Sequence, residues 1–204
     1  RQWALNDAGV FSDAVEEAVQ NRNDRALRFL MKSEARISPK SSESSSMAMT
    51  RGLVHAARYD NEELGEWLLT HNADPNRTDD IKGGLCPLEV AVSQQCFKMT
   101  ATLLEARADA SIEVSKARGG GTLLHLAMQM DESEDLYSII SPTTRIVGML
   151  LTARVDPNRQ NAAGQTPLHL AAAFARHSGS LFVKRLVDAK ASVSIEDRQG
   201  RRPI

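Results

Sequence analysis

Residues 161–172 read Asn-Ala-Ala-Gly-Gln-Thr-Pro-Leu-His-Leu-Ala-Ala, and this stretch decides the fold. Its first four residues have the chemistry of a tight turn, and Thr166 is a good N-cap for a helix whose first residue is Pro167. Within that helix Leu168 is large and Ala171 is small, so a neighbouring helix can approach closely. The stretch therefore predicts a turn followed by a short helix that packs against other helices.

Copies of this signal recur along the chain at a nearly constant spacing. A close copy begins at Thr122, and weaker copies begin at Asp13, Arg51 and Cys86. The step from Arg51 to Cys86 is 35 residues, and the step from Cys86 to Thr122 is 36 residues. The step from Thr122 to Thr166 is 44 residues, which indicates an insertion. Repetition at such a period predicts a row of similar layers that share one core.

A second pattern marks the end of a copy. A Leu-Leu pair at 68–69 precedes Ala-Asp-Pro-Asn at 73–76, and another pair at 150–151 precedes Val-Asp-Pro-Asn at 155–158. Before these ends, apolar residues recur at helical spacing and predict a second helix in each unit. The predicted apolar stripes are Ala26, Leu27, Leu30 and Met31; Leu64, Trp67, Leu68 and Leu69; Met99, Leu103 and Leu104; Ile146, Val147, Leu150 and Leu151; and Phe182, Val183, Leu186 and Val187.

Together these patterns resemble the ankyrin repeat, a unit of about 33 residues that folds as a β-turn and two antiparallel helices. The resemblance implies one all-α domain over residues 1–204, a solenoid of stacked helix-turn-helix units with β-turn or hairpin fingers. The implied units cover residues 9–38, 46–76, 81–111, 117–158 and 161–194, with a partial unit at 197–204. Because 197–204 match 161–168 and the chain starts at Arg1 rather than Met, we expect it to be a segment of a longer protein.

Several motif residues receive structural roles from this resemblance. Thr122 and Thr166 would begin first helices, Pro87 and Pro167 would occupy first helical positions, and His125 and His169 would hydrogen-bond between neighbouring turns. In the unit that starts at Cys86 the motif is eroded to Cys-Pro-Leu-Glu, so Glu89 stands at the histidine position.

The usual glycine after the second helix is absent. Its place is taken by Glu34, Asn72, Arg107, Arg154 and Lys190. If these positions adopt the left-handed conformation, each of them except Asn72 costs roughly 1 kcal/mol, and the array is less stable than an idealised one. The alternative is that the helix ends are remodelled.

Three stretches interrupt the period. Residues 38–46 are rich in serine and predict a mobile loop, with a phosphorylation cluster as the alternative. Residues 119–121 are three glycines that widen a turn. The insertion at 130–144 contains Leu136, Tyr137, Ile139 and Ile140. These four residues would either form an exposed docking site or pack back onto the unit, with Ser141 and Pro142 starting the next helix.

Composition excludes several classes of protein. The chain is 42% hydrophobic and 25% charged with a formal net charge of −1, which is typical of a folded domain and gives no general attraction to nucleic acid. No apolar stretch approaches the ~18 residues of a membrane span, so we expect no direct membrane insertion. Aromatic residues make up only 4%, which suits thin helical layers. Cys86 and Cys96 cannot form a disulfide framework, so we expect an intracellular, cytoplasmic protein.

No combination of residues indicates catalysis or metal binding. The histidines show no His-Glu-x-x-His spacing, and the cysteines form no Cys-x-x-Cys pair. We therefore expect no enzyme activity, no cofactor, no metal, no small-molecule substrate and no nucleic-acid partner.

A solenoid of this type presents an extended concave surface made by its turns and first helices, and the resemblance implies that this surface binds a partner protein. The positions carried over on first helices are Arg58, Tyr59, Ser93, Gln94, Gln129, Met130, Ala173 and Phe174. Those on turns are Lys82, Arg118, Ala162, Gln165, Arg198 and Gln199. Tyr59, Met130 and Phe174 would be the anchors of such an interface.

Two alternatives to this scaffold function remain open. The array could be the regulatory or docking segment of a larger enzyme, channel or multi-subunit membrane assembly whose activity lies outside residues 1–204. It could also be a fixed subunit of a large complex.

Overall fold

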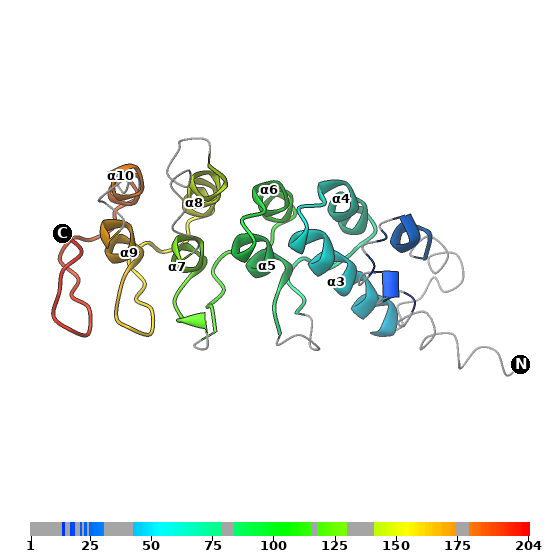
Figure 1. Cartoon of the computed structure of the whole chain (residues 1–204), viewed down its shortest axis with the longest axis horizontal. Coiled ribbons are helices and arrows are strands. Elements are labelled where there is room, and N and C mark those ends of the chain that lie inside the picture. Colours follow the sequence, from blue (N-terminus) through cyan, green and yellow to red (C-terminus); the bar gives the residue numbers. More distant parts are fainter. Residues whose placement is uncertain are drawn as a thin grey trace, which may run out of the picture.

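Pairs of short helices, stacked one after another, make up the described part of the chain. The computed structural model describes residues 14, 17–18, 21, 23, 25–30, 43–78, 84–115, 118–129, 141–173 and 180–204. Its labelled helices are α3 (Glu43–Arg58), α4 (Glu62–Thr70), α5 (Pro87–Ser93), α6 (Phe97–Glu105), α7 (Leu123–Met128), α8 (Pro142–Thr152), α9 (Pro167–Ala173) and α10 (Ser180–Asp188). One layer contains α3, α5, α7 and α9, and the other contains α4, α6, α8 and α10 (Figure 1). The predicted all-α fold of stacked helix pairs is confirmed.

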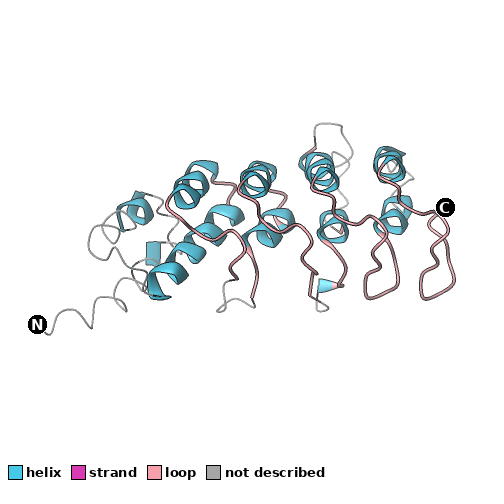
Figure 2. Ribbon diagram, turned by 180° about the vertical axis from the view of Figure 1, so that it is seen from behind, coloured by secondary structure: helices cyan, strands magenta, loops and turns pink. Residues whose placement is uncertain are grey.

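Finger-like loops join each helix pair to the next. They project beyond the layer that contains α5, α7 and α9, and the view from behind shows the same arrangement (Figures 1 and 2). In the finger before α7, Glu113 and Thr122 form an antiparallel β-bridge. All the described fingers therefore line one edge of the row.

Helix starts follow from local capping chemistry. Asn61, Cys86 and Ser141 each accept a hydrogen bond from the backbone N–H three residues later, at 3.0, 3.4 and 3.2 Å. Pro87 and Pro142 occupy the first positions of α5 and α8, where a missing N–H leaves no hydrogen bond unmade. Ser141 and Pro142 therefore begin the helix that the sequence predicted after the insertion.

The core is a chain of aliphatic side chains shared between neighbouring pairs. Leu53, Leu64, Leu103, Leu123 and Leu150 are among the fully buried residues, and they come from α3, α4, α6, α7 and α8. Burying one such side chain stabilises the fold by about 1.5–3 kcal/mol. Because no single pair encloses its own leucines, the pairs stabilise one another along the row.

Non-glycine residues hold the left-handed conformation where second helices end. Asn72, Arg107, Arg154 and Lys190 have φ of 67°, 63°, 62° and 71°. The N–H of the residue after each of them donates to a carbonyl five residues back, for example from Ala108 to Leu103 at 2.9 Å, which is the Schellman pattern. The helix ends are therefore kept rather than remodelled, at about 1 kcal/mol for each arginine or lysine. Glu34 lies outside the described residues.

The predicted end of the serine-rich loop at residue 46 is wrong. Helix α3 already begins at Glu43 and runs for 16 residues, so residues 43–46 are helical rather than loop. No proline or glycine lies between Pro39 and Gly52 to stop it, and helix formers at 47–49 continue it. Residues 142–144 of the predicted insertion belong to α8, in agreement with the alternative in which Ser141 and Pro142 start that helix. The phosphorylation alternative and the four apolar insertion residues fall wholly or mainly outside the described residues.

Candidate functional site

Buried His125 links two neighbouring turns. The backbone N–H of Thr122 donates to His125 Nδ1 at 3.0 Å, so the proton of the neutral ring lies on Nε2. That Nε2–H donates to the carbonyl oxygen of Gln165 in the next turn at 2.9 Å. Burial is the main cause that lowers the pKa of His125, which keeps the ring neutral.

His169 repeats this arrangement at the next turn. The Thr166 N–H donates to His169 Nδ1 at 3.0 Å, and His169 Nε2–H donates to the Arg201 carbonyl at 3.0 Å. Each receiving carbonyl also accepts a bond from its own finger, at 2.8 Å from Asn161 N to Gln165 O and at 2.9 Å from Asp197 N to Arg201 O. One carbonyl thus serves both its own turn and the neighbouring helix.

Glu89 occupies the equivalent position of α5 with different chemistry. Its side chain is buried, and its Oε1 lies 3.6 Å from Arg118 Nη1. Oε1 accepts no hydrogen bond from the residues that the structure describes. Burial raises the pKa of Glu89, and the nearby Arg118 guanidinium offsets part of that rise. The junction between α5 and α7 therefore lacks the histidine link.

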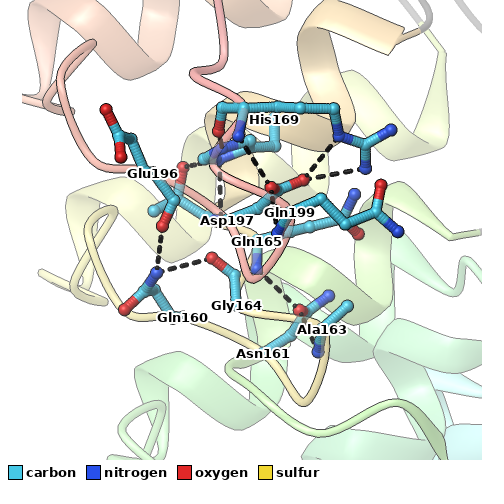
Figure 3. A network of polar contacts seen from close by, with 11 residues as sticks. Gln160, Asn161, Ala163, Gly164, Gln165, His169, Glu196, Asp197 and Gln199 are labelled. Atoms are coloured by element: carbon cyan, nitrogen blue, oxygen red, sulfur yellow. Dashed lines mark hydrogen bonds and ion pairs between the residues drawn. The ribbon is translucent and has the colours of Figure 1, made fainter.

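The fingers at 161–165 and 197–201 are braced by buried or half-buried side chains (Figure 3). Asn161 Oδ1 accepts from Ala163 N and Gln165 N at 2.9 and 3.0 Å. Asp197 Oδ1 accepts from Gln199 N and Arg201 N at 2.8 and 3.0 Å. The side-chain hydrogen bond from Arg201 is the main cause that lowers the pKa of Asp197 to about 2. These turns are rigid elements rather than open loops.

Hydrogen bonds also connect one finger to the next. The Ala162 N–H donates to Gly119 O at 3.0 Å, and the Arg198 N–H donates to Ala163 O at 3.2 Å. Gln160 Nε2 bridges Gly164 O at 2.6 Å and Glu196 O at 2.9 Å (Figure 3). The turn side chains on successive fingers are consequently held in register.

Two asparagines brace the loops that follow second helices. Asn76 Oδ1 accepts from Asp109 N at 2.7 Å, and Asn158 Oδ1 accepts from Ser192 N at 2.6 Å. Asn158 Nδ2 also donates to Lys190 O at 3.1 Å. The sequence showed both residues as repeat markers, in the two Asp-Pro-Asn patterns, but their bonding role was not predicted.

Three of the predicted partner-binding residues lie just after first helices, and a fourth position, Ser93, differs from the prediction. Tyr59, Gln94 and Gln129 follow directly on α3, α5 and α7 and are exposed. Ser93 is buried and its Oγ donates to Val90 O at 2.9 Å, so the prediction that Ser93 faces the groove is wrong. The last turn of α5 still packs against the core at that residue.

The other predicted positions vary in exposure. Arg58 and Gln165 are half-buried, while Arg118, Ala162, Ala173, Arg198 and Gln199 are exposed. Lys82, Met130 and Phe174 lie outside the described residues.

The described residues include two cysteines but no cluster of metal-binding side chains. In that part of the chain, no group of three or more His, Cys, Asp and Glu side chains could hold a metal ion. Cys86 and Cys96 are buried free thiols, and burial raises the pKa of both, to about 11 for Cys96. No helix among the described residues has the length and apolar character needed to cross a bilayer.

Comparison with known proteins agrees with the paired helices. The family model described as "Ankyrin repeat" matches residues 163–198, which include α9, α10 and the first residues of the finger that follows them. This chain is an ankyrin-repeat protein. Repeats of this family are generally protein-binding modules and are usually non-catalytic.

Two ankyrin-type relatives differ greatly in length. The Neurogenic locus Notch protein of Drosophila melanogaster is 34% identical over 92 residues, which are 45% of this chain and 3% of that protein. The ankyrin repeat protein FPV230 of Fowlpox virus (strain NVSL) is 25% identical over 171 residues, 74% of this chain and 89% of the viral protein. This ankyrin-repeat chain therefore spans only a small fraction of the Notch protein.

Proposed function

We propose that this ankyrin array binds a partner protein through its finger turns and the residues that end its first helices. We call this the groove surface and define it by Arg58, Tyr59, Gln94, Gln129, Arg118 and Gln165. The observation that carries the proposal is a sharp change in exposure at the helix ends. Every residue of α5 and α7 is buried, yet Gln94 and Gln129, which follow them directly, are exposed.

Tyr59 is the described anchor of the groove surface. Its side chain is 43% exposed, and its ring packs edge-on against His55 with the centroids 4.8 Å apart. A partly supported aromatic ring of this kind loses little conformational freedom on binding, and tyrosine is enriched among residues that dominate interface energies. Met130 and Phe174 would extend the anchor row according to the repeat register alone.

A binding function without chemistry fits the same surface. The exposed positions are spread over several helix pairs, whereas a catalytic site needs groups that converge on one reacting atom. We therefore propose no enzyme activity, no cofactor and no nucleic-acid partner. A cytoplasmic location is supported by the two free thiols and stays a prediction.

Site-specific photo-crosslinking tests the groove surface. A photoreactive residue at Gln94 should crosslink the partner, whereas the same residue at exposed Glu66 on α4, in the other helix layer, should not. The double variant Tyr59→Ala/Gln129→Ala should weaken binding of the crosslinked partner by about tenfold or more, with an unchanged circular dichroism spectrum. Equal crosslinking from Gln94 and Glu66, or unchanged affinity of the double variant, would refute the proposal.

A second function is favoured by one comparison. The match to the Notch protein covers 3% of that protein, so a segment similar to this array occurs within a much longer chain. On this proposal the array is the regulatory or docking segment of a larger assembly. Determining the full coding sequence decides it, because further repeats alone would favour the scaffold, and a catalytic or membrane block would favour the docking segment.

A further inference from the structure

A pocket of about 460 Å³ opens between the stacked fingers. Its lining comes from the finger before α7, from the finger before α9, and from Arg198 of the last finger. The hydrogen bonds from Ala162 to Gly119 and from Arg198 to Ala163 hold these three fingers against one another. The pocket is therefore part of the rigid finger edge and lies beside two turn positions of the groove surface, Arg118 and Gln165.

The charges around the pocket do not balance. Arg159 and Glu113 both line it and form an ion pair with each other. Nearby, Arg201 pairs with Asp197 at 2.8 Å and Arg202 pairs with Glu196 at 3.2 Å. Arg198 also lines the pocket and has no acidic partner in the part of the chain that the structure describes. The guanidinium of Arg198 is therefore not neutralised by a carboxylate among the described residues.

The backbone of Arg198 is fixed against the preceding finger. Its N–H donates to Ala163 O at 3.2 Å. The Arg198 chain also passes close to Gly164, where φ is 77°, because a Cβ added there would lie only 2.9 Å from Arg198 Cγ. The absence of a side chain at Gly164 therefore leaves room for the start of the Arg198 side chain at this turn.

Asn161 adds a hydrogen-bond donor to the same pocket. Its Oδ1 is used by the backbone N–H groups of Ala163 and Gln165. Its Nδ2 amide has no acceptor among the described residues, although Asn161 lines the pocket. A guanidinium and an amide donor at one opening are suited to a carboxylate, which accepts through both oxygens.

We propose that this finger pocket receives an aspartate or glutamate side chain of the partner protein, with Arg198 as its ion-pair partner and Asn161 as its amide donor. The inference rests on the proposed binding function and specifies the chemistry of the partner segment. A carboxylate fits better than a phosphate, because Glu113 also lines the pocket and would repel a doubly charged group. Nucleic acid would need several unpaired cations rather than one.

Ala162 gives a way to strengthen the site. It is exposed, lines the pocket, and stands at the same turn position as Arg118 and Arg198 in their fingers. Ala162→Arg would add a second unpaired guanidinium without removing any contact of the native turn. Ala153→Arg, at the exposed C-cap of α8, adds the same charge away from the fingers and is its matched control.

The test uses the whole chain, residues 1–204, as bait for a random peptide display library. The enriched peptides should carry an excess of Asp and Glu, and replacing these by Asn and Gln should weaken binding in fluorescence polarisation. Arg198→Glu should weaken the best peptide by about tenfold, and Ala162→Arg should tighten it by about threefold. Lys184→Glu, an exposed residue of α10, makes the same change in net charge and should change affinity less than about twofold.

Each outcome separates this inference from the proposed function. The proposal that the finger pocket receives a carboxylate is overturned if the enriched peptides lack acidic residues. It is also overturned if Arg198→Glu and Lys184→Glu have equal effects. If those same peptides still bind more weakly to Tyr59→Ala/Gln129→Ala, binding through the groove surface is supported and only the carboxylate site in the pocket is rejected. Competition by free glutamate at the peptide's own concentration would mean a small-molecule site and would also overturn it. A library with no enriched peptide counts against the binding function itself.

Discussion

Helix α7 packs against α5 on one side and against α9 on the other, but these two junctions differ in their hydrogen-bonding chemistry. At the second junction, His125 gives an N–H to the next turn and accepts an N–H from its own turn. At the first, Glu89 is buried at the equivalent position, and an ionised carboxylate has no proton to give. The two junctions therefore differ by one hydrogen bond, the bond that the histidine donates to the next turn.

The carbonyl groups that accept the histidine bonds can be compared between the two junctions. Gln165 O and Arg201 O each accept two bonds, one from their own finger and one from a histidine. Gly121 O, at the same place in the finger before α7, accepts a 2.9 Å bond from Val114 N. No bond from α5 to this carbonyl corresponds to the histidine links, because Glu89 takes the histidine position of that helix. We infer that hydrogen bonds stabilise the junction between α5 and α7 less than the junction between α7 and α9.

Removing the histidine link should have the largest effect. His125→Ala deletes a buried ring, its bonds to Thr122 and Gln165, and leaves a cavity beside fully buried core residues. We expect a loss of about 3 kcal/mol in the free energy of unfolding, measured by urea titration followed by circular dichroism. His71→Ala, at an exposed helix end, is the matched control and should cost less than about 1 kcal/mol. Equal losses would show that the turn-to-turn link is not stabilising.

Restoring the link at the weaker junction should give the next largest effect. By analogy with His125, Glu89→His should direct an Nε2–H toward Gly121 O. It also removes a buried carboxylate oxygen that accepts no hydrogen bond from the described residues. We expect a gain of about 1 kcal/mol in the same urea titration, since a net hydrogen bond contributes about that much. Glu89→Gln removes the charge but keeps nearly the same side-chain shape. It therefore measures the effect of removing the charge without adding the histidine hydrogen bond. If Glu89→His is less stable than Glu89→Gln, the comparison between the two junctions fails.

Much of the fold followed from the sequence because it depends on local patterns. The Thr-Pro-Leu-His start, the helical spacing of leucines and the Asp-Pro-Asn ends each report a nearby contact. The early start of α3 was missed because serine is only a weakly unfavourable helix former, and no proline or glycine marks the true boundary. The left-handed φ of Arg107, Arg154 and Lys190 was predicted as one of two outcomes, and only the three-dimensional structure could choose.

The candidate site followed from the sequence less completely. Repeat register identifies which residues share a position, so exposed Tyr59, Gln94 and Gln129 could be named in advance. It does not identify which side chains lack a partner, because Glu113 and Arg159 pair across 46 positions of the chain. Only the structure could show that Arg198 has no acidic partner among the described residues and that it lines a pocket.

The smallest effect we predict is a pH dependence that differs between the two junctions. Burial raises the pKa of Glu89 above its usual 4.5, so the folded chain holds that proton more tightly than the unfolded chain. Stability from this group is complete below pH 4.5 and is lost as pH rises through the folded-state pKa. Burial lowers the pKa of His125 below 6.5, so its contribution is present above pH 6.5 and is lost as pH falls through the folded-state pKa.

Melting temperatures measured from pH 8 down to pH 4 can separate these opposite trends. Glu89→Gln should melt above the wild type at pH 8, and this advantage should shrink as pH falls, because the wild-type carboxyl becomes protonated. Asp197 titrates at about 2 when folded and at 3.8 when unfolded, so its contribution stays nearly constant over most of this range. A constant advantage for Glu89→Gln would mean that Glu89 titrates as an ordinary carboxyl, and the contrast between the junctions would then rest on the missing N–H donor alone.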